Sequence, residues 1–331
     1  MRGWSLAASA DHVKALVKAH AAGDEEGFYA VALQMAAKAA RQGHNRLAAE
    51  LRDLIDRAKV EQVPERVSPT PVIRPKGELA ELVTAEYPRI RLRDMTLSKT
   101  VHEALQRILH EQRQRARLES YGFEPIHRVL LVGPPGTGKS MTGAALAGEL
   151  GLPLFTVRLD GLISRFMGET ASKLRIIFDA AKKTRAVYLF DEFDAIGAER
   201  TAVNDVGEAR RILNSFLLFL DETRPESPVV AATNHPQLLD RALFRRFDSV
   251  IAYDLPDRGQ AKEVLRRRLQ IMDTTKIDWP AIENHSAGLS HAELVRAAES
   301  AAKGAILRGE ESVSTAALIA ALDERANARR E

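Results

Sequence analysis

The sequence predicts an α/β fold, with a parallel five-stranded sheet between an N-terminal helical bundle and an all-helical C-terminal region. Three observations support this prediction. Five short apolar runs alternate with helical patterns in the middle of the chain, hydrophobic residues recur at helical spacing at both ends, and a proline-rich stretch separates the N-terminal part from the rest. Short apolar strands that alternate with helices are typical of a parallel sheet covered on both faces.

The first 60 residues have the periodicity of three helices. Apolar residues recur at helical spacing, for example at Val13, Leu16 and Val17, and glycines at positions 23 and 43 mark short connections. We expect residues 1–60 to form a helical bundle. Residues 61–77 follow with four prolines and no hydrophobic period, which indicates an extended, semi-rigid linker and a domain boundary.

The middle of the chain supplies the predicted sheet. A helix is expected from about Lys99 to Leu118, before the first strand. The five predicted strands are Arg128 to Val132, Leu154 to Arg158, Ala186 to Phe190, Val229 to Thr233 and Ser249 to Ala252. They place an α/β subdomain at residues 78–256. From Asp257 onward the pattern is helical only, so residues 257–331 are expected to form a C-terminal α-helical subdomain.

Composition excludes several classes of protein. A hydrophobic content of 45% and a charged content of 28% are those of a globular chain with a sizeable core. The sequence has no apolar run long enough to span a bilayer and no continuous apolar core of a secretion signal. The cysteine count is 0, which excludes disulfides, thiolate zinc sites and a cysteine nucleophile. We therefore expect a cytoplasmic protein that contacts no membrane.

The net charge of the chain does not identify a binding partner. The net charge is +3, far from a dedicated nucleic-acid footprint, and we expect no nucleic-acid ligand. The triplet Arg266, Arg267 and Arg268 lies in a helical pattern and is interpreted as a solvated face without a site role. The chain also lacks the HExxH and GxSxG patterns of common hydrolases.

A glycine-rich turn follows the first predicted parallel strand. An apolar run ends at Val132, the turn reads Gly-Pro-Pro-Gly-Thr-Gly-Lys-Ser, and a helical pattern follows, which is the context of a phosphate-binding P-loop. Its glycines allow backbone N–H groups to face phosphates, Lys139 supplies a positive charge, and Ser140 offers a hydroxyl to Mg²⁺. The alternative is an ordinary Gly-Pro turn. The predicted nucleotide-binding residues here are Gly133, Pro134, Pro135, Gly136, Thr137, Gly138, Lys139, Ser140 and Met141.

Two carboxylates end the third predicted strand. Asp191 and Glu192 follow an apolar run, where P-loop ATPases keep the acidic pair of the Walker B motif. We expect Asp191 to hold Mg²⁺, largely through water, and Glu192 to polarise the attacking water. The sequence therefore predicts ATP and Mg²⁺ as cofactors, with Ser140 and Asp191 as the metal-site residues.

With these motifs the chain resembles the AAA family of ATPases, from about residue 95 to residue 325. The resemblance implies the AAA+ core of a P-loop NTPase, with residues 257–331 as its helical lid. The run Val229 to Asn234 is similar to the family's sensor strand, which implies that Asn234 orients the water toward the terminal phosphate. The N-terminal bundle resembles the small helical domain that precedes the ATPase in several AAA remodelling proteins, although another docking role fits the pattern equally well.

A pair of arginines resembles the family's arginine fingers, which reach the nucleotide of the neighbouring subunit. Arg245 and Arg246 are adjacent here, whereas the family commonly has two residues between them. The sequence leaves the finger unassigned between the two. We favour Arg246, because Phe247 and Asp248 follow it, with Arg245 in support. The alternative is a surface pair at the end of a helix.

The segment Phe166, Met167 and Gly168 matches the aromatic-hydrophobic-glycine loop with which AAA unfoldases line their central pore. Apolar contact is non-directional and methionine adapts its shape, so such a ring of side chains would grip varied polypeptides. Packing of Phe166 in the core is the competing interpretation. Farther along, His291 stands where the family often has glycine at the start of the lid helix, either near the nucleotide or as a surface histidine.

The resemblance implies an ATP-hydrolysing ring, a hexamer of this chain, that remodels or unfolds protein substrates through a central pore. A protein substrate or adaptor would bind through the N-terminal helical domain. Two other classes remain open at this point. One is a nucleic-acid motor or helicase loader, and the other is an assembly switch that changes shape with nucleotide but does not thread its partner.

Overall fold

The computed structural model describes residues 75–162, 169–194, 205–223, 226–239 and 241–328, together with scattered positions between 14 and 53. The chain divides into two compact units, Met1–Thr70 and Pro71–Glu331. The predicted N-terminal bundle and most of the predicted linker lie outside the described residues. The fold below is that of the second unit.

The sheet of this unit has six strands in the order β1-β3-β4-β5-β2-β6. The strands are β1 (Val83–Glu86), β2 (Arg128–Val132), β3 (Leu154–Val157), β4 (Val187–Phe190), β5 (Val229–Thr233) and β6 (Ser249–Ala252). Strands β2 to β6 are parallel, which confirms the five predicted strands, with β3 and β4 each one residue shorter.

The sixth strand was not predicted from the sequence. β1 pairs antiparallel with β3 at the edge of the sheet, with Val83 opposite Val157. Only the first of its four residues is buried. Because the strand is short and mostly exposed, it carries neither an apolar run nor an alternating pattern, and sequence periodicity has no signal for it.

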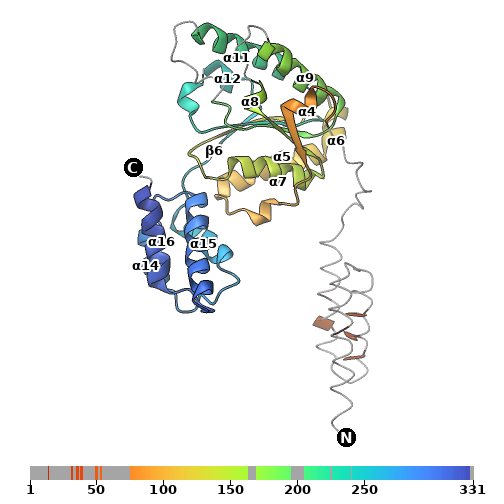
Figure 1. The fold of residues 1–331 in the computed structure, drawn as a ribbon. Helices are drawn as coiled ribbons and strands as arrows, with labels where there is room; N and C mark the ends of the chain where they lie inside the picture. Colours follow the sequence, from red (N-terminus) through yellow and green to blue (C-terminus); the bar gives the residue numbers. More distant parts are fainter. Residues whose placement is uncertain are drawn as a thin grey trace. The chain divides into compact units, whose positions relative to one another are not determined.

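Helices cover both faces of the sheet (Figure 1). One face carries α5 (Lys99–Arg113) and α7 (Lys139–Leu150), and the other carries α9 (Glu169–Lys183) and α11 (Asp205–Asp221). The predicted helix from Lys99 to Leu118 is interrupted at Gln114, where α6 (Arg115–Ser120) begins. The shorter elements are α4 (Leu79–Leu82), η1 (Leu92–Asp94), α8 (Leu159–Leu162), η2 (Pro236–Leu238) and α12 (Arg241–Phe244).

Aromatic packing anchors strand β4 from the side of α9 and α11. Phe190 stacks on Phe178 of α9 at 5.6 Å between ring centroids and meets Phe216 of α11 edge-on at 5.1 Å. Just beyond the strand, Phe193 lies 4.5 Å from the same Phe216 ring. Buried aromatic pairs of this kind add to the free energy of area burial, so the end of β4 is held on a rigid platform.

The register of the sheet brings three strand ends to one edge. In the parallel pairs, Val132 of β2 lies opposite Thr233 of β5, and Phe190 of β4 lies opposite Ala231. The segments that follow β2, β4 and β5 therefore emerge side by side at the carboxyl edge of the sheet. In open α/β sheets, this edge is where ligands bind.

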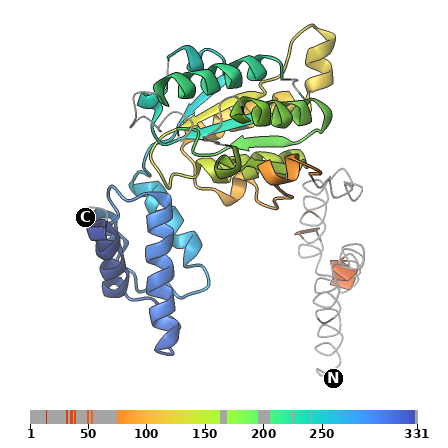
Figure 2. The same cartoon turned by 45° about the horizontal axis from the view of Figure 1, so that its top comes forward.

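The four C-terminal helices pack around a hydrophobic core of their own, which includes Leu265, Leu294 and Leu318. They are α13 (Arg258–Arg268), α14 (Trp279–His285), α15 (His291–Leu307) and α16 (Thr315–Ala328). Figure 2 shows these helices in blue as a group separate from the sheet and its covering helices. None of the described helices is both long and apolar enough to cross a membrane.

Candidate functional site

The loop between β2 and α7 depends on its glycines. The φ values of Gly133, Gly136 and Gly138 are 144°, 73° and 102°. Residues with a Cβ atom rarely adopt such positive φ values, whereas glycine does so readily. Space is also restricted, because a Cβ at Gly133 would lie 2.2 Å from the Tyr253 carbonyl oxygen. The glycines therefore allow both the backbone turn and the close approach of strand β6.

The loop leads directly into the first turn of α7. The helix begins at Lys139, and its N-cap residue, Gly138, has no side chain to accept a hydrogen bond from the first turn. Backbone N–H groups and the positive end of the helix dipole therefore face the concave side of the loop, an arrangement that favours an anion. Ser140 and Met141 are exposed beside this turn.

Lys139 is held inside the loop by backbone oxygens. The side chain is 6% exposed, and its Nζ donates hydrogen bonds of 2.7 Å to the carbonyls of Gly133 and Pro134. Burial lowers the pKa of the ammonium, and the charges of Asp191 and Asp194 partly oppose this effect. Within the described residues, Lys139 has no carboxylate at ion-pairing distance. The cation is thus desolvated and unneutralised, a state that binding of a phosphate would stabilise.

The two acidic residues after β4 adopt an unusual turn. Glu192 has a φ of 49°, and it is the only residue other than glycine with positive φ in the described part of the chain. Its N–H donates to Asp191 Oδ1 at 3.0 Å, while its side chain is exposed. Such strained backbone persists where the surrounding structure fixes it, and it is frequent at functional sites. Here the N–H of Phe193, which donates to the Ala232 carbonyl at 2.8 Å, holds the turn on β5.

Asp194 joins this turn to the predicted sensor residue and was missed in the sequence analysis. The side chain is 9% exposed, and its Oδ1 accepts a hydrogen bond of 3.2 Å from the N–H of Asn234. The neighbouring Thr233 carbonyl accepts from the N–H of Gly133 at 3.3 Å. One network therefore connects the P-loop, the acidic turn and Asn234. A carboxylate two residues after the acidic pair was the available sequence signal.

The structure does not bring Arg245 and Arg246 to this site. Both follow α12 and precede β6, and the N–H of Asp248 donates to the carbonyl of Arg128 at the start of β2. Because β2 and β6 are parallel, the arginines lie at the amino edge of the sheet, opposite the P-loop. The length of a five-residue strand, about 16 Å, separates the two edges.

The two arginines also differ in their contacts. Arg246 forms an ion pair with Asp221 at the end of α11, and Asp221 is also 3.7 Å from Arg128. Arg245 is exposed and has no hydrogen-bond or ion-pair partner among the residues that the structure describes. The predicted pore-loop residues Phe166, Met167 and Gly168 lie outside the described residues.

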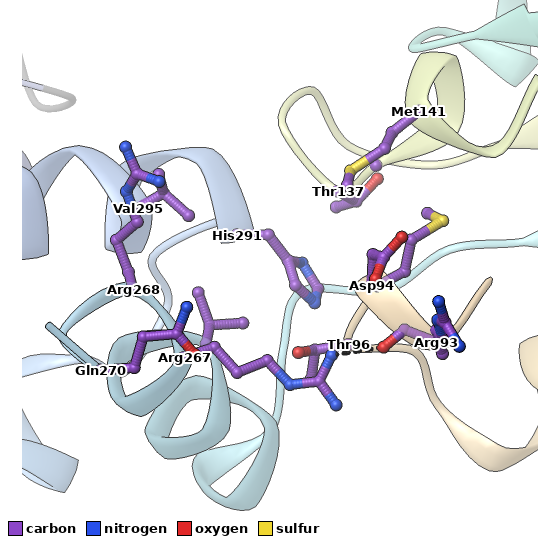
Figure 3. A pocket seen from close by; sticks show the side chains of 13 residues that line it. Arg93, Asp94, Thr96, Thr137, Met141, Arg267, Arg268, Gln270, His291 and Val295 are labelled. Carbon is purple, nitrogen blue, oxygen red and sulfur yellow. Dashed lines mark hydrogen bonds between the residues drawn. The ribbon is translucent and has the colours of Figure 1, made fainter. Parts of the chain in front are cut away.

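A cavity of about 600 Å³ opens beside the P-loop (Figure 3). Its walls come from η1 and the residues after it, from the first turn of α7, and from α13 and α15 of the C-terminal helices. The residues that line it are Arg93, Asp94, Met95, Thr96, Thr137, Gly138, Met141, Val264, Arg267, Arg268, Gln270, His291 and Val295. The volume lies within the range of small-molecule and cofactor pockets.

Hydrogen bonds connect the C-terminal helices to both sides of this cavity. The N–H of Ala292, in the first turn of α15, donates to the Gly136 carbonyl at 3.0 Å. Arg267 donates to the Arg93 carbonyl at 2.7 Å and pairs with Glu263 at the same distance. All three arginines of the triplet are exposed, as expected for a solvated face, but Arg267 and Arg268 also line the cavity, and Arg267 bridges the two subdomains.

These features define a P-loop nucleotide-binding protein: a glycine cradle with a buried lysine after β2, an acidic turn after β4 at the same edge of the sheet, and a cavity of about 600 Å³ beside the cradle. Residues 129–255 match the profile of the family described as "ATPase family associated with various cellular activities (AAA)". The chain is 32% identical to the AAA family ATPase y4kL of Sinorhizobium fredii over 93% of both chains. It belongs to the AAA family and is an ATPase.

Two further relatives fit this assignment. The chain is 36% identical, over 68% of its length, to the ATP-dependent zinc metalloprotease FtsH of Helicobacter felis, and the match spans 37% of that protein. Among solved structures, the FIGL-1 AAA domain matches with a TM-score of 0.61 and 25% identity, and the alignment covers 80% of this chain and 97% of that one.

Proposed function

We propose that this AAA ATPase works as a ring, a hexamer of this chain, which remodels or unfolds protein substrates through a central pore. The observation that carries the ring is the position of Arg245, exposed and unpartnered within the described residues, at the sheet edge opposite its own P-loop. An arginine finger placed there serves the nucleotide of a neighbouring subunit.

The phosphates bind in the cradle formed by Gly133 to Ser140. Their oxygens replace the Gly133 and Pro134 carbonyls as partners of the Lys139 ammonium, which is already desolvated and needs no carboxylate to be displaced. Ser140 and Asp191 would hold Mg²⁺, which supplies neutralisation of the phosphate charge. The exposed Ser140 hydroxyl and the Asp191 carboxylate are oxygen ligands of the kind that this ion prefers.

Hydrolysis uses the strained turn after β4. Glu192 accepts a proton from the attacking water as general base, because its carboxylate is exposed and only its backbone N–H is bound to Asp191. Asn234 orients the water, and Asp194 fixes the backbone of Asn234. The platform of Phe190 and Phe193 holds the turn that carries Glu192 and Asp194.

The geometry favours Arg245 over Arg246 as the finger, in contrast to the preference drawn from the sequence. Arg246 would have to leave Asp221 before reaching another subunit, whereas Arg245 has no described partner to give up. An arginine finger typically contributes about 10³ to 10⁵ in rate in phosphoryl-transfer enzymes. Arg246 then orients the loop that presents Arg245.

Protein remodelling is supported by the pore-loop pattern at Phe166, Met167 and Gly168 and by similarity to FtsH, named as a protease. Residues 1–60 would bind the substrate or adaptor, residues 61–77 would link them to the α/β subdomain at 78–256, and residues 257–331 would act as the lid. The arginine triplet gives no support to a nucleic-acid motor. Arg266 lies over the Trp279 ring, and Arg267 and Arg268 pair with glutamates of their own chain.

Two measurements test this proposal. If the catalytic site is shared between subunits, ATP turnover per subunit rises with protein concentration; turnover that is maximal and constant down to the monomeric range contradicts the ring. For the pore, Phe166→Ala leaves basal ATPase largely intact but abolishes unfolding of a tagged substrate. Undiminished unfolding in that variant, or stimulation only by one folded partner, favours the non-threading switch instead.

A further inference from the structure

His291 occupies a central place in the cavity beside the P-loop. It is the first residue of α15, and Figure 3 shows its ring projecting from that helix toward the segment that carries Asp94 and Thr96. Both ring nitrogens are inaccessible to solvent, and neither makes a hydrogen bond of ordinary geometry with a described residue. The Thr96 backbone interacts with the imidazole, and at least one of the two ring nitrogens is a buried polar atom without a partner among the described residues.

Three other polar residues on the cavity wall, Arg267, Arg268 and Gln270, differ from His291 in this respect. Arg267 is bound to Glu263 and to the Arg93 carbonyl, and Arg268 forms an ion pair with Glu299. Gln270 is exposed to solvent, which satisfies its amide. Because a buried polar atom without a partner is unfavourable, turning the His291 ring from the Thr96 backbone toward a hydrogen-bonding occupant of the cavity would be favoured.

The position of the cavity limits what part of a nucleotide reaches His291. The phosphates are held at the cradle around Lys139, and Thr137, Gly138 and Met141 line both the cradle side and the cavity. The remainder of the nucleotide, its ribose and base, then extends into the cavity between η1 and the C-terminal helices. His291 lines this cavity and is therefore placed to contact the nucleoside.

We propose that His291 hydrogen-bonds the nucleoside of the bound nucleotide and is a determinant of nucleotide affinity and selectivity. This inference rests on the proposed phosphate site. A neutral imidazole offers one donor and one acceptor, and both the base edge and the ribose hydroxyls present complementary groups. Burial lowers the pKa of the imidazole, and the Thr96 backbone partly opposes this effect. Because the pKa is lowered, the neutral form dominates at pH 7.

The test compares ATP with inorganic tripolyphosphate, which has the phosphates but no nucleoside. Binding is measured by calorimetry on the full chain carrying Glu192→Gln, so that ATP is not consumed. His291→Phe keeps a planar ring without hydrogen bonds, and His291→Ala removes the ring. We expect both to weaken ATP binding by about 10-fold and to leave tripolyphosphate affinity unchanged. His102→Phe, at an exposed position of α5 outside the cavity lining, is the control and leaves both affinities unchanged.

The outcomes separate this inference from the phosphate site. Lys139→Ala should weaken both ligands; if it weakens neither, the phosphate site is wrong, whatever His291 does. ATP affinity within twofold of the parent in both His291 variants overturns the inference. So does an equal loss for tripolyphosphate, which would mean that His291 acts by packing α15 on the P-loop. If the parent prefers ATP over 2′-deoxy-ATP and His291→Phe abolishes this preference, the contact is to the ribose. If the parent prefers ATP over GTP and His291→Phe abolishes that preference, the contact is to the base.

Discussion

Arg246 is ion-paired with Asp221 of its own chain, and this contact separates the roles of two adjacent arginines. Asp221 also lies 3.7 Å from Arg128, whose guanidinium in turn binds Asp248 at 2.7 Å. Arg246 is thus tied to a network at the amino edge of the sheet, whereas Arg245 lies next to it without a described partner. The contrast leads to different expectations for the two side chains.

Arg245→Ala is expected to lower kcat for ATP by about 10³, with ATP affinity unchanged, because the finger acts on charge that develops in the transition state. Arg246→Ala should cost less, on the order of 10-fold in kcat, since it removes only the positioning of the loop. Steady-state kinetics on both variants at saturating protein concentration provide the measurement. The reverse order of effects would contradict the assignment of Arg245.

Glu192→Gln should preserve ATP binding while reducing turnover by about 10² to 10⁴, because the amide cannot accept a proton from water. Single-turnover hydrolysis and equilibrium ATP binding measure the two quantities separately. Asp191→Asn is the informative comparison, since it should also weaken binding when Mg²⁺ is present. Rapid turnover in Glu192→Gln would exclude this residue as the base.

Asp194→Ala is expected to reduce kcat by about 10-fold through Asn234, whose N–H loses its carboxylate acceptor. The effect should be strongly non-additive with Asn234→Ala, because Asp194 acts by positioning the Asn234 side chain, which this substitution removes while the backbone N–H remains. A double-mutant cycle on kcat measures this coupling. Fully additive losses would mean that Asp194 acts independently of Asn234.

The pH dependence of stability should report on Asp248. Burial disfavours its charged form, but hydrogen bonds from Arg128 and from the N–H groups of His127 and Arg128 outweigh this and lower the pKa below its ordinary value. A carboxyl with a lowered folded-state pKa stabilises the protein above its unfolded pKa of about 3.9, and this contribution is lost as pH falls through the folded-state value.

Asp248→Asn should therefore lower the free energy of unfolding by about 1–3 kcal/mol at pH 7, and the difference from the parent should shrink below about pH 4. Denaturant unfolding between pH 3 and 7, under conditions of reversible folding, measures it. A difference that stays constant over this range would mean that the charge of Asp248 contributes nothing to stability.

Much of the fold was predictable because its signals are local. The five apolar runs, the glycine-rich turn and the acidic pair each occupy a few consecutive residues, and all five strands were confirmed. β1 was missed because a short edge strand with one buried residue has no hydrophobic pattern. Its existence depends on pairing with β3, a partner more than sixty residues away in the chain.

The parts of the site that escaped prediction depend on contacts between distant segments. Asp194 gains its role from Asn234, Arg267 from the Arg93 carbonyl, and Arg246 is distinguished from Arg245 only by Asp221. Sequence spacing identifies residue types at a strand end, but it carries no information about which side chain is already engaged. That distinction requires the packed structure.

The central claim, a catalytic site completed by a neighbouring subunit, is tested most directly by co-expressing two inactive variants. In a mixed ring, an Arg245→Ala subunit keeps its own cradle and Glu192 and receives Arg245 from a Glu192→Gln neighbour. We predict ATPase activity well above the sum of the two variants alone, and none when the second chain carries both substitutions. Mixed rings that form but remain as inactive as their components would contradict the shared site.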